Sequence, residues 1–283
     1  MNWKGGVIPM PYFKTTDNTN LYYEIHGEGI PVVFIHGFSE SQDSFRIQKR
    51  ALSKKFKVVT YDIRGHGLSD KVDYGLNMER FAQDLKELME YLNIKDIVLV
   101  GWSMGAYVIF EYINQFGEEN VSKICIIDKG PKILNDESWN LGLYHGQYTN
   151  EDAEKDLELI KDDFMEFGEK FIKRMTPYFD EKQLEIGLTR FAKNNPSILY
   201  EIWKDMIKRD YRFVLNRITV PTLIMFGGNS TFYSIETAEY LRDNIKNSEL
   251  ITFEDCTHLL VLENPVKFNR VLEEFISDYM KGR

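Results

Sequence analysis

The feature that most constrains the fold is a series of short apolar runs, which recur along the chain with little alternation between apolar and polar residues. They are PVVFIHG (31–37), KVVTYD (57–62), DIVLVGW (96–102), KICIID (123–128), TLIMFGG (222–228) and ELITFED (249–255). Runs of this kind are typical of strands that are covered on both faces, as in a parallel sheet. We therefore expect these segments to form one sheet.

Amphipathic segments lie between the apolar runs. From Met78 to Leu92, apolar residues recur every three or four positions and would give a helix one apolar face to pack on the sheet. Similar patterns predict helices at about 41–52, 104–116, 235–246 and 265–280. Strands that alternate with helices indicate right-handed strand-helix-strand units, so the sequence predicts an α/β fold with helices flanking a mostly parallel sheet.

The alternation stops between Pro131 and about Arg217 and resumes at TVPTLIMFGG. No strand-like run occurs in this interval, and apolar residues return to helical spacing at Leu157, Ile160, Phe164, Phe167 and Phe171 and again at Ile198, Ile202 and Met206. The interval therefore interrupts one sheet. We predict that residues 1–131 and 218–283 form the two parts of a core, and that residues 132–217 form an inserted helical cap.

The composition argues against several classes of protein. Of the 283 residues, 43% are hydrophobic and 28% are charged, which is typical of a globular protein and not of a disordered one. No apolar stretch approaches the roughly 20 residues of a membrane-spanning helix. The net charge of −9 argues against nucleic-acid binding, because phosphate contacts depend on clustered Lys and Arg. The N-terminal residues lack the apolar core of a signal peptide, so we expect a cytoplasmic location.

The cysteines and histidines do not suggest a metal site. Cys125 and Cys256 are expected to be free thiols, and two cysteines do not suffice for a cysteine-based zinc site. The five histidines show no HExxH spacing. We therefore expect neither a metal nor another cofactor. No feature of the sequence indicates an oligomeric state.

A serine bracketed by glycines follows one of the apolar runs. Gly101-Trp102-Ser103-Met104-Gly105 fits the pattern Gly-x-Ser-x-Gly, with a predicted strand before it and a predicted helix after it. This context is the one in which the pattern forms a tight turn that presents the serine, since larger residues at the glycine positions would collide with neighbouring backbone. Ser103 is therefore a candidate nucleophile.

Several motifs around this turn occur in a characteristic order. His36-Gly37-Phe38, the segment from Asp62 to Ser69, the serine turn and Asp255-Cys256-Thr257-His258 follow one another along the chain. In this order the chain resembles the α/β-hydrolase family, and within it the branch of serine esterases and metal-free haloperoxidase-like enzymes. The resemblance extends over nearly the whole chain. It implies a mostly parallel, twisted sheet of about eight strands with the predicted insertion as a cap.

His258 is the candidate base for Ser103. A serine hydroxyl must lose its proton to a neighbouring base as it attacks, and His258 follows the last apolar run at the sheet edge where the carboxyl ends of parallel strands meet. A purely structural histidine is the alternative. The resemblance implies that His36 and His66 brace nearby loops, while His26 has no motif around it, and His145 lies in the insertion, where a surface or packing role is favoured over contact with substrate.

The resemblance also implies donors for a negatively charged oxygen that forms during acyl transfer. These are the backbone N–H groups of Phe38 and Met104. The Phe38 side chain would line the substrate pocket. Trp102 is a second candidate for substrate contact, and a packing role is an equally good interpretation of that residue.

The acid that would orient His258 is not at the position usual for the family. Many relatives carry an aspartate after the strand that corresponds to TLIMFGG, but this chain continues Gly-Gly-Asn-Ser-Thr-Phe-Tyr. Some relatives carry the acid at the end of the preceding strand, where this chain has Asp128, and we assign that role to it. The alternatives are that Asp128 is a turn residue and that Asn229 orients the histidine. Asp255 lies too close to His258 in sequence to be favoured, and Asp62 resembles a structural residue.

These residues favour acyl chemistry. A serine at position 103, instead of a carboxylate, argues against dehalogenase and epoxide hydrolase activity. We expect a serine hydrolase that acts on a small or medium carboxylic ester without a cofactor. Lactone, thioester or carbon–carbon bond hydrolysis and perhydrolysis use the same residues, and a weakly catalytic receptor for a small ligand is the alternative from another class.

Aromatic residues of the insertion would cover the site and form an apolar chamber for the substrate. For any single one of them, packing of the insertion against the core is the favoured alternative. These residues are Trp139, Tyr144, Tyr148, Phe164, Phe179 and Trp203.

Overall fold

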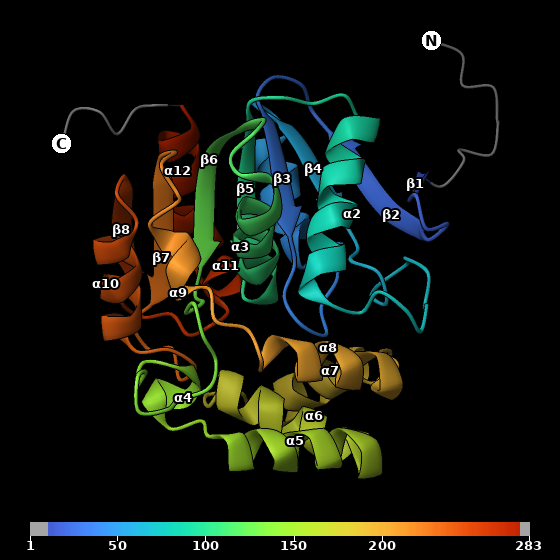
Figure 1. Cartoon of the computed structure of the whole chain (residues 1–283), viewed down its shortest axis with the longest axis vertical. Coiled ribbons are helices and arrows are strands. Elements are labelled where there is room, and N and C mark those ends of the chain that lie inside the picture. Colours follow the sequence, from blue (N-terminus) through green and yellow to red (C-terminus); the bar gives the residue numbers. More distant parts are fainter. Residues whose placement is uncertain (1–10, 278–283) are drawn as a thin grey trace.

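A computed structural model describes residues 11–277 and contains one eight-stranded sheet (Figure 1). The spatial order is β1-β2-β4-β3-β5-β6-β7-β8. The strands from β4 to β8 in this order pair in parallel, whereas β1 and β2 are antiparallel to their neighbours. The predicted fold class and strand number are confirmed. The strands are β1 (Tyr12–Lys14), β2 (Asn20–His26), β3 (Pro31–Ile35), β4 (Lys57–Tyr61), β5 (Ile97–Trp102), β6 (Val121–Ile127), β7 (Thr222–Gly227) and β8 (Ser248–Phe253).

Each of the predicted apolar runs overlaps most of one of the strands β3 to β8, whereas β1 and β2 correspond to no such run. The reason is their position at one side of the sheet. Only the middle residue of β1 is buried, and the last residues of β2 are exposed. Strands β5 and β7 are buried along their whole length, as the apolar runs predict. Partial burial leaves β1 and β2 without a sequence signal of that kind.

The predicted helices between the strands are present. Helices α2 and α3 pack against each other on the face of the sheet turned to the viewer in Figure 1, and α1 packs against α12. The segment predicted as one helix over 41–52 divides into a short 3₁₀ helix and α1. Residues 278–280 of the last predicted helix lie outside the described residues. The bounds are η1 (Gln42–Phe45), α1 (Arg46–Leu52), α2 (Met78–Tyr91), α3 (Met104–Phe116), α10 (Ile235–Asn244), α11 (Leu260–Glu263) and α12 (Pro265–Ile276).

Between β6 and β7 the chain is mainly helical, and Figure 1 shows helices α4 to α8 gathered along one edge of the sheet. Two of these helices begin with a capping box, Thr149 with Asp152 at α5 and Asp180 with Gln183 at α7. The helices lie in the interval predicted for the insertion, and its boundaries as a domain stay a prediction. The bounds are α4 (Leu143–Gly146), α5 (Asn150–Asp162), α6 (Phe164–Met175), α7 (Glu181–Phe191), α8 (Pro196–Met206) and α9 (Arg212–Leu215).

No helix within residues 11–277 combines the length and the apolar character needed to cross a membrane.

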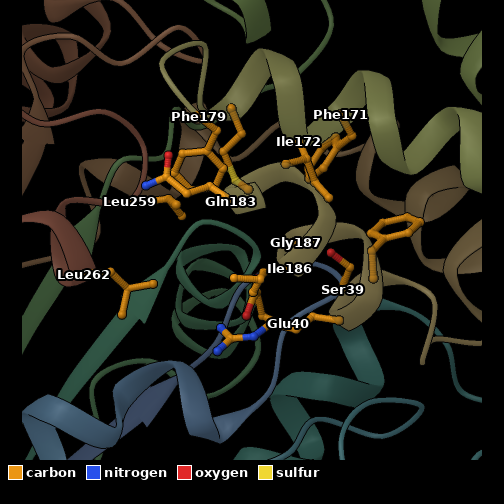
Figure 2. A pocket seen from close by; sticks show the side chains of 13 residues that line it. Ser39, Glu40, Phe171, Ile172, Phe179, Gln183, Ile186, Gly187, Leu259 and Leu262 are labelled. Carbon is orange, nitrogen blue, oxygen red and sulfur yellow. The ribbon is translucent and has the colours of Figure 1, made fainter. Parts of the chain in front are cut away.

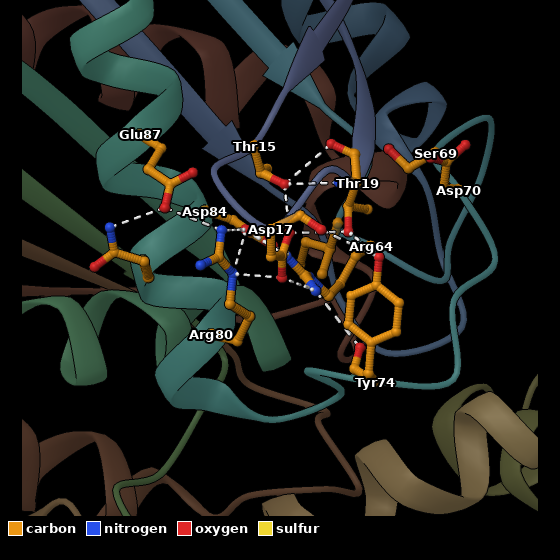
Figure 3. Close-up of polar contacts among 12 residues, drawn as sticks. Thr15, Asp17, Thr19, Arg64, Ser69, Asp70, Tyr74, Arg80, Asp84 and Glu87 are labelled. Atoms are coloured by element: carbon orange, nitrogen blue, oxygen red, sulfur yellow. Dashed lines mark hydrogen bonds and ion pairs between the residues drawn. The ribbon is translucent and has the colours of Figure 1, made fainter.

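A buried ion-pair network joins the β1–β2 turn and the loop after β4 to helix α2 (Figure 3). The guanidinium of Arg64 donates through Nε and Nη2 to the two carboxylate oxygens of Asp84, at 2.6 and 2.7 Å. Asp17 pairs with Arg64 from the β1–β2 turn, and Arg80 donates to Asp84 from within α2. Arg64 has no solvent exposure, so its charge depends on these carboxylates.

We expect Asp84→Asn to lower the free energy of unfolding by about 3 kcal/mol, because it leaves the buried charge of Arg64 partly uncompensated. Glu90→Gln is a matched control on the same helix, since Glu90 is exposed and its ion pair within residues 11–277 is with Lys86, four residues away. That change should alter stability by no more than about 0.5 kcal/mol. Urea unfolding measures both variants. Equal stabilities of the two would contradict a structural role for the network.

Candidate active site

Ser103 lies at the sharp turn between β5 and α3. Its φ of 52° and ψ of −117° are values that a residue with a side chain rarely adopts. A Cβ on Gly101 would lie 2.6 Å from the carbonyl oxygen of Gly105, and a Cβ on Gly105 would lie 2.1 Å from the carbonyl oxygen of Ile35. Both glycines are therefore required where α3 starts against the end of β3, as the Gly-x-Ser-x-Gly pattern predicts.

The Ser103 hydroxyl is accessible. Ser103 is partly exposed, whereas the residues on either side of it are buried. Among residues 11–277 its Oγ makes no hydrogen bond, and it is not one of the fully buried polar atoms without a partner. The same holds for Nε2 of His258. Both atoms therefore keep some accessible surface and have no protein partner to displace when a ligand binds.

Asp128 and His258 form a buried pair. Nδ1 of His258 lies 3.0 Å from Oδ1 of Asp128, and the two side chains are 2% and 0% exposed. Asp128 follows directly after β6 and has a φ of 44°. Like Ser103, it is therefore a non-glycine residue with a positive φ at this edge of the sheet. The carboxylate also accepts hydrogen bonds from the backbone N–H of Gly227 and from the hydroxyl of Ser230, both at 2.9 Å.

Two hydrogen bonds bring Ser103 to this pair. The backbone N–H of Ser103 donates to the carbonyl of Ile127, the residue before Asp128, at 3.0 Å. The indole N–H of Trp102, the residue before Ser103, donates to the carbonyl of His258 at 3.0 Å. Ser103, Asp128 and His258 thus lie at the carboxyl ends of adjacent strands and in the loop after β8. No direct hydrogen bond joins Ser103 to His258 in the described chain.

The predicted oxyanion donors flank Ser103. A Cβ on Gly37 would lie 3.3 Å from the Cβ of Ser103, which shows how closely the loop after β3 approaches the serine. Within the described residues, the backbone N–H groups of Phe38 and Met104 donate to no protein acceptor. Both are therefore available to a ligand oxygen, and their role in catalysis stays a prediction.

Trp102 is 1% exposed. Its ring meets Phe45 edge-on and lies tilted against the imidazole of His258. With its N–H on the His258 carbonyl, Trp102 supports the histidine loop. Its packing role is visible in the structure, and its contact with substrate stays a prediction.

The residues weighed as alternatives lie in other surroundings. Asn229 and Asp255 are exposed, and in the described chain neither side chain bonds to His258. Asp62 accepts the backbone N–H groups of Gln42 and Leu68, both at 2.7 Å, and so holds two loops together. His145 lies in the insertion and donates from Nε2 to the carbonyl of Ser230 at 2.7 Å.

His36 braces the loop after β4. Its Nε2 accepts the backbone N–H of Ile63 at 3.0 Å, and its Nδ1 donates to the carbonyl of Gly37 at 2.8 Å, so the ring must be neutral. Burial lowers the pKa of His36 from 6.5 to about 4. His66 packs edge-on against it, and burial lowers the pKa of His66 as well.

Because the contacts of His36 require a neutral ring, we expect the protein to lose stability in acid. Between pH 6.5 and about 4 the unfolded chain binds a proton at His36 that the folded chain does not, so stability falls as the pH is lowered through this window. The loss should reach about 3 kcal/mol. Urea unfolding of wild type and His36→Gln at pH 7 and pH 4 measures it, and the variant should lose less stability than wild type. The same loss in both proteins would show that the proton does not bind at His36.

Aromatic side chains from the core and the insertion meet over the site. The ring centroid of Phe38 lies 5.8 Å from that of Phe171 in α6 and 5.1 Å from that of Trp203 in α8. Phe232, in the loop after β7, lies 5.3 Å from Phe171 and 4.5 Å from the imidazole of His258. Of the predicted aromatic residues of the insertion, Trp203 belongs to this cluster, whereas Trp139 packs on Tyr240 of α10.

A mainly apolar pocket of about 180 Å³ lies beside this cluster (Figure 2). Figure 2 shows Phe171, Ile172 and Phe179 along one side of the space and Glu40 and Leu262 along the other. Leu259, next to His258, and Ser39, next to Phe38, also line the pocket. The pocket therefore borders both loops that carry the candidate machinery.

Sequence reasoning did not assign roles to Phe232 and Ser230. Both lie in the loop after β7, and the spacing of 102 residues between Ser230 and its partner Asp128 leaves no local pattern. The only signal in the sequence was the missing carboxylate at this position.

The family model described as the alpha/beta hydrolase fold matches residues 30–265. The chain belongs to the α/β-hydrolase family. An esterase from Exiguobacterium antarcticum is similar in structure, with a TM-score of 0.87, 26% identity and coverage of 94% of this chain and 98% of the other. A bromoperoxidase from Bacillus anthracis has a TM-score of 0.85 and 27% identity over 92% and 96% of the two chains. A non-heme haloperoxidase of Rhodococcus erythropolis is 28% identical over 94% of this chain and 99% of its own. This member of the α/β-hydrolase family is an enzyme of the serine-hydrolase type.

Proposed function

We propose that the protein is a serine hydrolase that cleaves a small or medium carboxylic ester through an acyl-enzyme. The observation that carries this proposal is the buried hydrogen bond between His258 and Asp128 beside the strained turn of Ser103. It supports Asp128, at the end of β6, as the acid that orients the histidine. The assignment is consistent with the exposed positions of Asn229 and Asp255.

The proposed reaction begins with attack of Ser103 Oγ on the ester carbonyl while Nε2 of His258 takes the hydroxyl proton. Asp128 holds Nδ1–H and stabilises the imidazolium. The N–H groups of Phe38 and Met104 bind the carbonyl oxygen as it becomes negative. The ester C–O bond then breaks, and His258 returns the proton to the leaving alcohol. Water, deprotonated by His258, releases the acid from Ser103. Proton transfer requires a hydrogen bond between Ser103 and His258, and in many enzymes such a bond forms only when substrate is bound.

The pocket supports a substrate with an apolar group of limited size. Its volume of about 180 Å³ is close to the roughly 150 Å³ of an apolar cavity that accommodates benzene. We propose that the helical insertion acts as a cap whose helices α6 and α7 bind this group against the core. The proposed partner is therefore a small acyl compound, neither a nucleic acid nor a membrane, and the cytoplasmic location stays a prediction from the sequence.

Perhydrolysis is a second candidate, favoured by the similarity to a non-heme haloperoxidase. In that reaction hydrogen peroxide, instead of water, attacks the acyl-enzyme and releases a peracid. The first half of the reaction and its residues are the same.

We expect Asp128→Asn to lower kcat about 10⁴-fold at neutral pH, because an amide at this position favours the wrong histidine tautomer. Asp255→Asn is the matched control, since this exposed carboxylate lies near His258 in sequence and should leave kcat unchanged. A fluorophosphonate probe should label wild type and fail to label Ser103→Ala. Labelling that persists in Ser103→Ala, or normal turnover of Asp128→Asn, would contradict the proposed mechanism.

A panel of p-nitrophenyl esters tests the size of the pocket. We expect kcat/KM to rise with acyl length up to about six carbons, the size of the group that such a cavity accommodates, and then to fall. Gly187→Leu should move the optimum to shorter esters, because a side chain at this position of α7 points at Ile172 and into the pocket without a backbone clash. Hydrolysis of the acetate ester is the internal control and should stay unchanged. An unmoved optimum would place the acyl group elsewhere.

A further inference from the structure

Ser230 lies in the loop after β7, where many members of the family carry the acid. In this chain the proposed acid is Asp128, which follows β6, and Ser230 contacts it. Its hydroxyl donates to Oδ1 of Asp128 at 2.9 Å, on the same oxygen that faces Nδ1 of His258. The backbone N–H of Gly227 donates to Oδ2 at 2.9 Å. Ser230 is 4% exposed. Both carboxylate oxygens are thus bound from β7 or its loop.

The same hydroxyl organises the rest of the loop. Its Oγ accepts the backbone N–H groups of Phe232 and Tyr233, at 3.3 and 3.5 Å. The Phe232 ring in turn lies 4.5 Å from the imidazole of His258 at a tilt of 40°. Ser230 therefore contacts two neighbours of the His258 ring, the carboxylate of Asp128 and Phe232, whose backbone N–H donates to its hydroxyl oxygen.

A strained turn of the insertion holds this loop from outside. Tyr144 and His145, both with φ of 55°, are consecutive left-handed residues, a conformation that persists only where the surroundings determine it. His145 donates from Nε2 to the carbonyl of Ser230 at 2.7 Å and from its backbone N–H to the carbonyl of Phe232 at 3.4 Å. Arg174 of α6 packs over the Tyr144 ring, and its carbonyl accepts the hydroxyl of Thr231.

We propose that Ser230 is a positioning residue, which holds Asp128 in the orientation that the reaction requires. His145 of the insertion binds the carbonyl of Ser230 and so stabilises loop 229–233 around Asp128 and His258. This inference rests on the proposed function. Ser230 acts through Asp128 and does not line the pocket, so it should affect the rate of the chemical step and not the binding of substrate.

Ser230 is expected to matter for the rate because the buried carboxylate of Asp128 needs several hydrogen-bond donors. A fully buried carboxylate is stable as an anion only when hydrogen bonds surround it, and Oδ1 without Ser230 would keep the imidazole as its sole side-chain donor. With only the Gly227 N–H on Oδ2 and the imidazole on Oδ1, the carboxylate would turn more readily about its bond to Cβ. Each turn away from Nδ1 removes the group that fixes the histidine tautomer.

The test compares Ser230→Ala and Ser230→Thr with Ser234→Ala, a matched change directly after this loop, where the hydroxyl lies near Thr237 of α10. Ser230→Ala should lower kcat about 10-fold with KM unchanged, the loss expected for one hydrogen bond to a charged group. The threonine variant keeps the hydroxyl and should recover most of the rate. Fluorophosphonate titration of active sites normalises each rate to folded enzyme, so a stability loss alone leaves the corrected kcat at the wild-type value.

His145 gives a second, exposed position at which the inference can be tested. His145→Ala should lower kcat a few-fold, and His145→Gln, which retains an N–H donor, should not. Because both residues act on one loop, the double variant with Ser230→Ala should lose less rate than the product of the two single losses.

The outcomes separate this inference from the proposed function. If Asp128→Asn or Ser103→Ala retains full activity, the proposed function is wrong, whatever Ser230 does. If those variants are inactive while Ser230→Ala keeps the wild-type kcat per active site, only the positioning role is overturned. A rise in KM without a fall in kcat, or strictly independent effects of the two positions, overturns it as well.

Discussion

The arrangement of the site depends on one close contact, the approach of the start of α3 to the end of β3. A Cβ at Gly105 would lie 2.1 Å from the Ile35 carbonyl, so the helix can begin there only without a side chain. This approach places Ser103 beside the loop that carries Gly37 and Phe38. The turn that joins β5 to α3 must then adopt the strained dihedral angles of Ser103, and the strain is maintained because the strand is buried along its length and the helix is buried from Met104 to Ile113.

A second constraint is the burial of a carboxylate at the same edge. Asp128 has no solvent exposure, and an ion in such a place needs donors on both oxygens. The imidazole of His258, the N–H of Gly227 and the hydroxyl of Ser230 supply them. The Asp128–His258 pair is therefore a packing unit that joins β6, β7 and the loop after β8, and the proposed chemistry depends on the same hydrogen bonds as its stability.

The sequence predicted those features that have a local pattern. Fully buried strands such as β5 appear as apolar runs, and the turn around Ser103 has its two glycines within five residues. Strands β1 and β2 were missed because partial burial at the side of the sheet leaves no continuous apolar run. The assignment of Asp128 depended on knowing which strands are neighbours, and that information came from the family resemblance. The donors to Asp128 could not be predicted, since Ser230 is 102 residues away and its short side chain has no distinctive spacing.

The proposed acid, Asp128 at the end of β6, changes what the loop after β7 has to supply. Because β6 lies between β5 and β7, an acid at the end of β6 is one strand nearer to Ser103 than an acid at the end of β7. The β7 loop then no longer has to supply a charge, and a neutral hydroxyl at Ser230 is enough to bind the carboxylate from the far side. A neutral loop can also carry an aromatic ring against the imidazole and accept the His145 contact from the insertion, which a second buried carboxylate would disturb by repulsion. With the proposed acid at the end of β6, the covering helices can contact the histidine's surroundings through hydrogen bonds between uncharged groups of the β7 loop and the insertion.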